Sequence, residues 1–194
     1  EELAQRDYFQ PSIAIILYAV LPMSWTAFEC VAKDTWVACL DAGNTTAGHR
    51  AIRSLSNKDA VGGLAAKHIN IEMLAKHNFD IRNRLGTVLA DKFDFTGMDG
   101  IRRAYRSAFA QNASELGFLD VADLDQLQSY RNLIVHRGGI ADEAFTKRTA
   151  TSLAVGDRVV LSGDLVAAFV ESAVRSGVEL LKFADCWLMS NGSS

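Results

Sequence analysis

Long apolar stretches with very little proline constrain the fold of this chain most strongly. Only 2 of the 194 residues are proline, against 14 glycines, and alanine-rich apolar segments recur along the sequence. A strand-rich fold needs many closely spaced turn clusters, so this balance favours helices. Hydrophobic residues make up 49% of the chain, enough for an ordinary globular core. We therefore expect residues 1–194 to form a single all-α domain, an antiparallel helical bundle.

The periodicity of apolar residues indicates where the helices begin and end. A first helix is expected from about Leu3 to Leu40, interrupted or kinked by the two prolines, and a last one from about Asp164 to Met189. The β-branched segments around Gly156-Asp157 predict a small β-hairpin over residues 151–162, before the last helix. The tail, residues 190–194, is expected to be disordered. Shorter helices are predicted at about 47–55, 59–77, 80–93, 98–111 and 121–137.

Residues 8–28 carry no charge and raise the question of a membrane span. The stretch includes both prolines, and its densest apolar part, Ile13 to Met23, is shorter than the roughly 20 residues that cross a bilayer. The chain also opens with Glu1-Glu2, whereas a signal peptide begins with basic residues. We expect a buried core helix here and no membrane partner.

The cysteines and histidines favour neither a disulfide framework nor a metal site. Cys30, Cys39 and Cys186 are an odd number without C-x-x-C spacing, which indicates reduced thiols in a cytoplasmic protein. The three histidines before residue 80 do not stand at metal-ligand spacing with acids. We therefore expect no metal and no cofactor.

The charge is unevenly distributed along the chain, although the net charge is only -3. Residues 49–106 hold eleven Lys or Arg and six Asp or Glu, a local charge of +5, whereas the rest carries -8. This basic middle either faces a polyanion or is an ordinary solvated surface. Within it, Arg102, Arg103 and Arg106 could hold a nucleic-acid backbone while Tyr105 stacks on a base. A solvated helix face is the simpler account of these arginines.

An arginine lies where the helix expected at 121–137 should be apolar. On a helical wheel, Arg131 falls in the middle of an apolar stripe, with Asn132 and His136 stacked on the adjoining face. Arginine is almost never fully buried without a partner, so Arg131 must meet an acid, line a cleft or face another subunit. The stripe is formed by Leu124, Leu127, Ile134 and Val135.

This turn of helix combines a permanent cation, a titratable imidazole and a neutral amide. The planar fork of Arg131 suits a phosphate, and the imidazole of His136 suits proton transfer near neutral pH. Metal-free RNA cleavage needs these two functions. A single imidazole cannot easily remove one proton and donate another, whereas two copies across a two-fold axis could. The residues also allow a structural alternative, in which Arg131 pairs with a buried acid and His136 caps the helix end.

The six residues from Arg131 to His136 resemble the R-x(4–6)-H signature of the HEPN superfamily. The polar Asn132 directly after the Arg also resembles the residue that this family favours there. Tyr130 before the motif, Arg137-Gly-Gly-Ile140 after it, the late Val155-Gly-Asp-Arg158 and the early Ala19–Glu29 stretch are also similar to the RiboL-PSP-HEPN-like RNase branch. The resemblance implies a helical bundle that forms homodimers and, in catalytic members, cuts single-stranded RNA without metal. It implies that Arg131 clamps phosphate, that His136 is the acid and base, and that Asn132 positions the substrate.

Accessory residues are less clearly indicated. Some relatives carry E-x-x-x-K-R on an early helix, and Glu29-Cys-Val-Ala-Lys33 matches its first part, but Asp34 stands where the Arg should be. Glu29 and Lys33 are therefore either accessory residues or an ordinary i,i+4 surface pair. Tyr130 and Arg137, which flank the motif, are further accessory candidates.

The sequence thus predicts a metal-independent endoribonuclease with a composite Arg/His site across a homodimer. The resemblance implies a toxin–antitoxin or phage-defence setting, with an antitoxin or a larger defence assembly as a further partner. Many superfamily members lack nuclease activity. The alternative is therefore a non-catalytic HEPN module that binds nucleotide, RNA or protein and dimerises.

Overall fold

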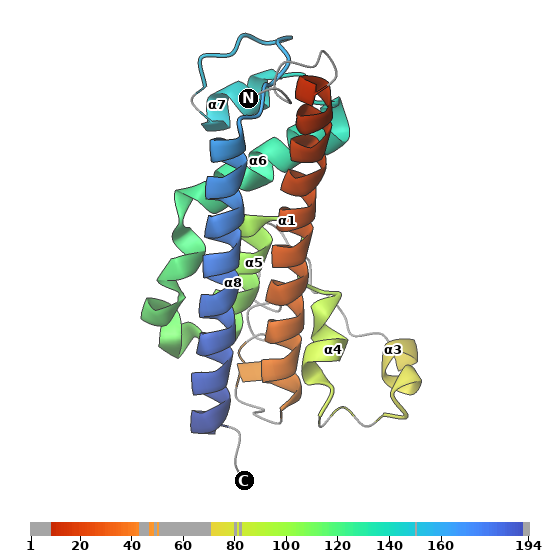
Figure 1. Ribbon diagram of the computed structural model, residues 1–194. Coiled ribbons are helices and arrows are strands. Elements are labelled where there is room, and N and C mark those ends of the chain that lie inside the picture. The colour runs from red at the N-terminus through yellow and green to blue at the C-terminus, as the bar shows by residue number, and fades with distance from the viewer. Residues whose placement is uncertain are drawn as a thin grey trace. The chain divides into compact units, whose positions relative to one another are not determined.

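The computed structural model describes residues 9–42, 47–48, 50, 71–79, 81, 83–149 and 151–191 (Figure 1). Most of these residues lie in helices and none lies in a strand, which confirms the all-α prediction. The chain divides into two compact units, and each is described by itself. Unit 1 comprises residues 1–28 and 120–176, and unit 2 comprises residues 29–119 and 177–194.

Unit 1 is built from parts of two long helices and from two shorter ones. The long helices are α1 (Phe9–Asp41), which contributes residues 9–28, and α8 (Gly163–Asn191), which contributes residues 163–176. The shorter ones are α6 (Ala122–Arg137) and α7 (Glu143–Thr149), which pack against each other.

An aromatic cluster holds α6 in place within unit 1. The ring of Tyr130 on α6 lies 4.9 Å from that of Phe145 on α7 and 5.3 Å from that of Phe169 on α8. Phe145 and Phe169 are both buried, and Leu124 and Leu127 on α6 are fully buried as well. Because large buried side chains dominate packing energetics, this cluster determines where α6 places its last two turns.

Unit 2 has a separate aromatic core. Trp36 on α1 packs against Phe93 and Phe95, and its indole N–H donates to the carbonyl of Ala104 over 3.0 Å. Besides the remaining parts of α1 and α8, the unit contains α3 (Ile71–Lys76), α4 (Leu85–Ala90), α5 (Met98–Ala108) and nearly all of the 3-10 segment η2 (Ala110–Asp120).

The close contact between α4 and α1 in unit 2 depends on a glycine. A Cβ at Gly86 would lie 2.4 Å from the carbonyl oxygen of Val37, so only glycine fits there. Next to it, Thr87 donates its backbone N–H and its hydroxyl to the two carboxylate oxygens of Asp41, over 3.1 and 2.6 Å. α4 is shorter than the helix predicted at 80–93.

The long helices agree best with the sequence. α1 continues through Pro22, so the chain is not interrupted there, and α8 reaches Asn191, two residues into the tail predicted to be disordered. Residues 1–8 and 192–194, and nearly all of the helix predicted at 47–55, lie outside the described residues.

The predicted β-hairpin at 151–162 does not form among the described residues. The segment turns at residues 154–157, but the arm that follows pairs with the chain just after α6 rather than with residues 151–153. One isolated antiparallel bridge joins Ile140 to Arg158. The turn forms at the expected residues, but the partner of the second arm lies before α7 in the sequence, which a local pattern does not reveal.

The start of α1 is only half buried, contrary to the prediction of a core helix. Leu21 and Trp25 are fully buried, whereas Ile15 and Met23 are 71% and 69% exposed. Among the described residues, α1 is one helix long and apolar enough to cross a membrane, by length and composition alone. One face of this segment therefore builds the core of unit 1 and the other presents apolar side chains to solvent.

Candidate functional site

Two glycines end α6 directly after the motif. Gly138 and Gly139 have φ angles of 59° and 80°, in the left-handed region that favours glycine, and their N–H groups donate to the carbonyls of Ile134 and Leu133. The guanidinium of Arg158 donates to the carbonyl of Gly138 over 3.1 Å. These three hydrogen bonds hold the end of α6, and with it the motif, in place.

Arg131 turns towards the two residues that the sequence associated with it. Its Nη1 donates to Oδ1 of Asn132 over 3.0 Å and lies 3.4 Å from Nε2 of His136. A guanidinium can only donate, so Nε2 can accept this contact when the imidazole carries its proton on Nδ1. The three side chains therefore form one connected polar group at the end of α6.

The buried nitrogen of Arg131 has neither a hydrogen-bond acceptor nor an acidic partner among the described residues. Its Nε is buried and has no hydrogen-bond partner among the described residues, and no described carboxylate pairs with its guanidinium. The structural alternative, an ion pair with a buried acid, is therefore not found in this part of the chain.

The prediction of a buried apolar stripe around Arg131 is correct for its first two residues and wrong for Val135. Leu124 and Leu127 are fully buried, but Val135 is 51% exposed, and Leu133 is buried in its place. The buried face rotates because the second half of α6 packs against α7, a helix that the sequence pattern did not predict. Val135 therefore lies exposed one turn from Arg131.

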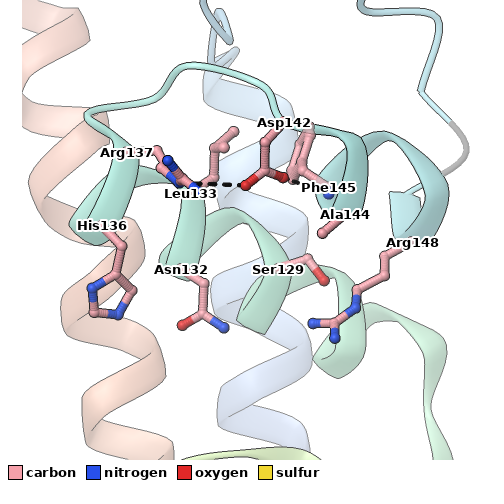
Figure 2. Close-up of a pocket in the computed structure, with 9 residues that line it drawn as sticks. All are labelled: Ser129, Asn132, Leu133, His136, Arg137, Asp142, Ala144, Phe145 and Arg148. Atoms are coloured by element: carbon pink, nitrogen blue, oxygen red, sulfur yellow. Dashed lines mark hydrogen bonds and ion pairs between the residues drawn. The ribbon is translucent and has the colours of Figure 1, made fainter. Parts of the chain in front are cut away.

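A pocket of about 220 Å³ opens between the end of α6 and α7 (Figure 2). Asn132, His136, Ser129 and Arg148 point their polar groups to the same side of it, with His136 at one end and Arg148 at the other. No motif in the sequence singles out Ser129 or Arg148. The remaining lining residues are Leu133, Arg137, Asp142, Ala144 and Phe145.

Asp142 fastens α7 to the end of α6. Its Oδ1 accepts the backbone N–H of Phe145 over 2.8 Å, which caps α7, and its Oδ2 lies 3.4 Å from Nε of Arg137 (Figure 2). Arg137, an accessory candidate, thus lines the pocket and is already paired. Tyr130, the other flanking candidate, packs in the aromatic cluster, and burial raises the pKa of its hydroxyl.

Glu29 and Lys33 belong to unit 2, and the motif belongs to unit 1. There they line a separate pocket of about 260 Å³, together with Asp91 and Asp94. Their accessory role remains a prediction. Among the described residues, no three His, Cys, Asp or Glu side chains are grouped so that they could hold a metal ion.

Two of the residues predicted to bind nucleic acid on α5, Arg102 and Tyr105, make contacts within the fold. Arg102 donates its Nε to the carbonyl of Leu119 over 2.9 Å and lies 3.7 Å from Asp99, with only 15% of its side chain exposed. Tyr105 is fully buried and donates to the carbonyl of Ala32, so it cannot stack on a base as predicted. Arg103 and Arg106 are exposed, and their role in holding a nucleic-acid backbone stays a prediction.

Comparison with known proteins adds no relative from which a function could be taken. No family model, no curated protein and no solved structure matches this chain.

Proposed function

We propose that this protein is a metal-independent endoribonuclease of the HEPN type that cleaves single-stranded RNA at a composite site across a homodimer. The observation that carries the proposal is the contact of one guanidinium, on Arg131, with both Asn132 and His136 beside an open pocket. The described residues provide no acidic partner for this cation, and a cation next to an imidazole is suited to a phosphodiester.

The reaction follows from these groups. Nε2 of one imidazole removes the proton of a ribose 2′-hydroxyl, and the 2′-oxygen attacks the adjacent phosphorus. The bond from phosphorus to the 5′-oxygen breaks, and this oxygen takes a proton from the second imidazole, which enters the reaction protonated while the first enters it neutral. The products are a 2′,3′-cyclic phosphate and a 5′-hydroxyl end, and the guanidinium stabilises the negative charge on the phosphoryl oxygens. The 3.4 Å contact between Arg131 and Nε2 is long, so a substrate hydroxyl can replace it.

In this proposal the second imidazole comes from another copy of the chain. Unit 1 contains one histidine in its sequence, His136, and a symmetric dimer supplies its equivalent. The exposed Val135, one turn from Arg131, is an apolar side chain that a partner copy would cover.

The cellular setting is also part of the proposal. Cys30, Cys39 and Cys186 are free thiols, in keeping with a cytoplasmic protein. The HEPN resemblance supports a role in defence or in a toxin–antitoxin pair, with an antitoxin or a larger assembly as regulator.

A cleavage assay on single-stranded RNA in EDTA tests the activity. The wild type should release 2′,3′-cyclic phosphate ends, and Arg131→Ala and His136→Ala should each abolish the release. His77→Ala is the matched control: it removes the same side chain outside the R-x(4)-H motif and should leave cleavage unchanged. Cleavage at the wild-type rate by both motif variants would rule the proposal out.

One observation favours a second function. In the single chain, Nε2 already lies in contact with Arg131, as it would in a module that binds a nucleotide without cutting it. Such a non-catalytic HEPN module would bind RNA or a nucleotide in the same pocket and release no cyclic phosphate from any RNA.

A further inference from the structure

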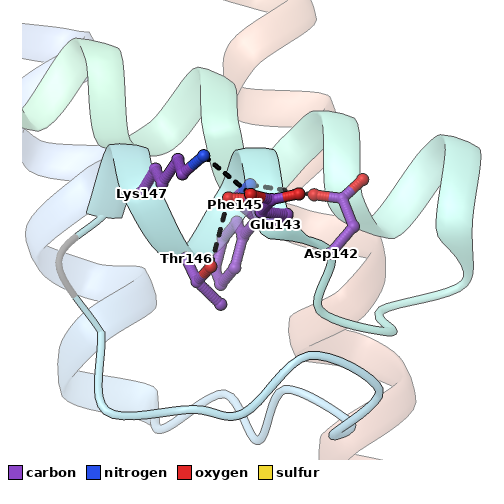
Figure 3. A network of polar contacts seen from close by, with 5 residues as sticks. All are labelled: Asp142, Glu143, Phe145, Thr146 and Lys147. Carbon is purple, nitrogen blue, oxygen red and sulfur yellow. Dashed lines mark hydrogen bonds and ion pairs between the residues drawn. The ribbon is translucent and has the colours of Figure 1, made fainter.

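The cations around the pocket differ in how they are paired. Arg137 is paired with Asp142, and Lys147 on α7 is paired with Glu143 over 2.7 Å. Arg148, the next residue after Lys147, lines the pocket, and no described residue pairs with its guanidinium. Figure 3 shows the Lys147 ammonium directed to Glu143 within the α7 network. The neighbouring cations Lys147 and Arg148 therefore differ: Lys147 is paired with a carboxylate, whereas Arg148 is available for a ligand.

The groups beside Arg148 are also free to meet a polar ligand. Oδ1 of Asn132 accepts from Arg131, so its amide nitrogen remains available to donate into the pocket. The hydroxyl of Ser129 donates to the carbonyl of Asp125 over 2.8 Å, so its oxygen can still accept a hydrogen bond. Between His136 and Arg148, the pocket thus offers a donor and an acceptor (Figure 2).

We infer that Arg148 forms a second phosphate-binding position, at the end of the pocket opposite His136. The site then takes a polynucleotide that carries a phosphate next to the scissile one, and a dinucleotide with a single phosphodiester leaves Arg148 empty. A fixed guanidinium fork binds phosphate oxygens in pairs, whereas Ser129 and Asn132 suit the ribose or base between two phosphates. The inference rests on the proposed function only in taking the phosphate beside His136 as the scissile one.

Equilibrium binding tests the position without any cleavage. The probe is a short, fluorescent, single-stranded oligouridylate with every 2′-hydroxyl methylated, which removes the nucleophile. Arg148→Gln should weaken binding about ten-fold, as expected for a lost charge-assisted hydrogen bond. It should also reduce the slope of log Kd against log salt by about 0.7, as expected for one phosphate contact on a single strand. Lys147→Gln is the matched control, since it removes the same charge from the adjacent position.

A substrate with neutral linkages locates the contact. Each phosphodiester next to the scissile one is replaced in turn by an uncharged methylphosphonate, and KM and kcat are measured. One replacement should raise KM of the wild type about as much as Arg148→Gln does, and should add nothing to that variant. Loss of a residue that only supports the fold would lower kcat with every substrate and would leave the effect of each neutral linkage on KM unchanged.

The inference is overturned if Arg148→Gln binds the probe no more weakly than Lys147→Gln, or if no neutral linkage removes its effect. A failure of the proposed function is a different result: His136→Ala would still cleave RNA. The two outcomes are independent, because the binding probe cannot be cut.

Discussion

At the scale of single residues, Arg131 combines a functional contact with a cost to stability. Its Nη1 meets Asn132 and His136, while its Nε is buried without a hydrogen-bond partner among the described residues. An unsatisfied buried polar group costs about 1–3 kcal/mol. A residue retained for its packing alone would not carry such a group, so the cost fits a position selected for binding an anion.

Replacing Arg131 by methionine should therefore separate stability from activity. Arg131→Met keeps most of the aliphatic stem and removes the buried Nε that has no hydrogen-bond partner among the described residues, so we expect the free energy of unfolding to stay equal or rise by about 1 kcal/mol. RNA cleavage should be lost at the same time. Urea denaturation of the wild type and the variant measures the first effect. A loss of more than about 1 kcal/mol would mean that the charge is compensated by a partner after all.

Cys39 shows how burial controls reactivity in this chain. Desolvation raises the pKa of its thiol from 9.0 to about 12, whereas Cys30 and Cys186 are exposed. Because only the thiolate reacts, we expect a disulfide reagent at pH 8 to label Cys30 and Cys186 rapidly and to leave Cys39 unlabelled. Denaturant should release the third thiol. Mass spectrometry of the native protein identifies the labelled residues, and rapid labelling of Cys39 would contradict the buried position.

The residue contacts that the sequence predicted are the local ones. Asn132 and His136 lie within five positions of Arg131 on one helix, so helical geometry alone brings them within its reach. Arg148 could not be found in this way. It follows α6 by eleven residues, on a helix of only seven residues with a single buried apolar side chain, Phe145.

At the scale of elements, the glycine pair that ends α6 determines where the motif sits. Gly138 and Gly139 are both left-handed, but they differ in their surroundings: a Cβ at Gly138 meets nothing within 4 Å, whereas at Gly139 it would lie 2.7 Å from the Tyr18 hydroxyl. That hydroxyl donates to the carbonyl of Val159. Gly139 therefore has both a conformational and a steric reason to be glycine.

The two positions should respond differently to alanine. Gly138→Ala should cost about 1 kcal/mol of unfolding free energy, the strain of a left-handed alanine. Gly139→Ala should cost about 2–3 kcal/mol, because the same strain is joined by displacement of Tyr18 from its hydrogen bond. Thermal and urea unfolding of both variants give the comparison. Equal losses at the two positions would show that the contact with Tyr18 has no energetic weight.

The elements that the sequence predicted well are those with long periodic patterns. α1, α6 and α8 extend over many turns, so the recurrence of apolar residues identifies them despite Pro22. The error at residues 151–162 has a different origin. β-branched residues and a Gly-Asp turn specify extended chain, but Gly139 and Ala141 supply hydrogen-bond partners from the other side of α7 in the sequence.

At the scale of the whole molecule, the proposed nuclease needs more than one chain. Unit 1 holds one His136, one Arg131 and several exposed apolar side chains, including Ile15, Met23 and Val135. Apolar surface of this kind commonly marks an interaction site. Val135 is the informative member, since helical spacing places it beside Arg131 and therefore beside any second motif that completes the site.

Polar substitution at Val135 should thus weaken the dimer and the activity together. Val135→Asn adds no charge that would repel RNA, and it removes the burial of one valine from each copy. The loss of about 3 kcal/mol for the pair corresponds to a Kd of dimerisation raised on the order of 100-fold. Specific activity should fall at low protein concentration and recover as concentration rises, and analytical ultracentrifugation should show the same midpoint.

Val155→Asn, at a 65% exposed position in the turn before the last helix, is the matched control and should change neither the dimerisation nor the activity. Full activity from a wild-type chain that stays monomeric would exclude a composite site, because one imidazole would then have to perform both proton transfers.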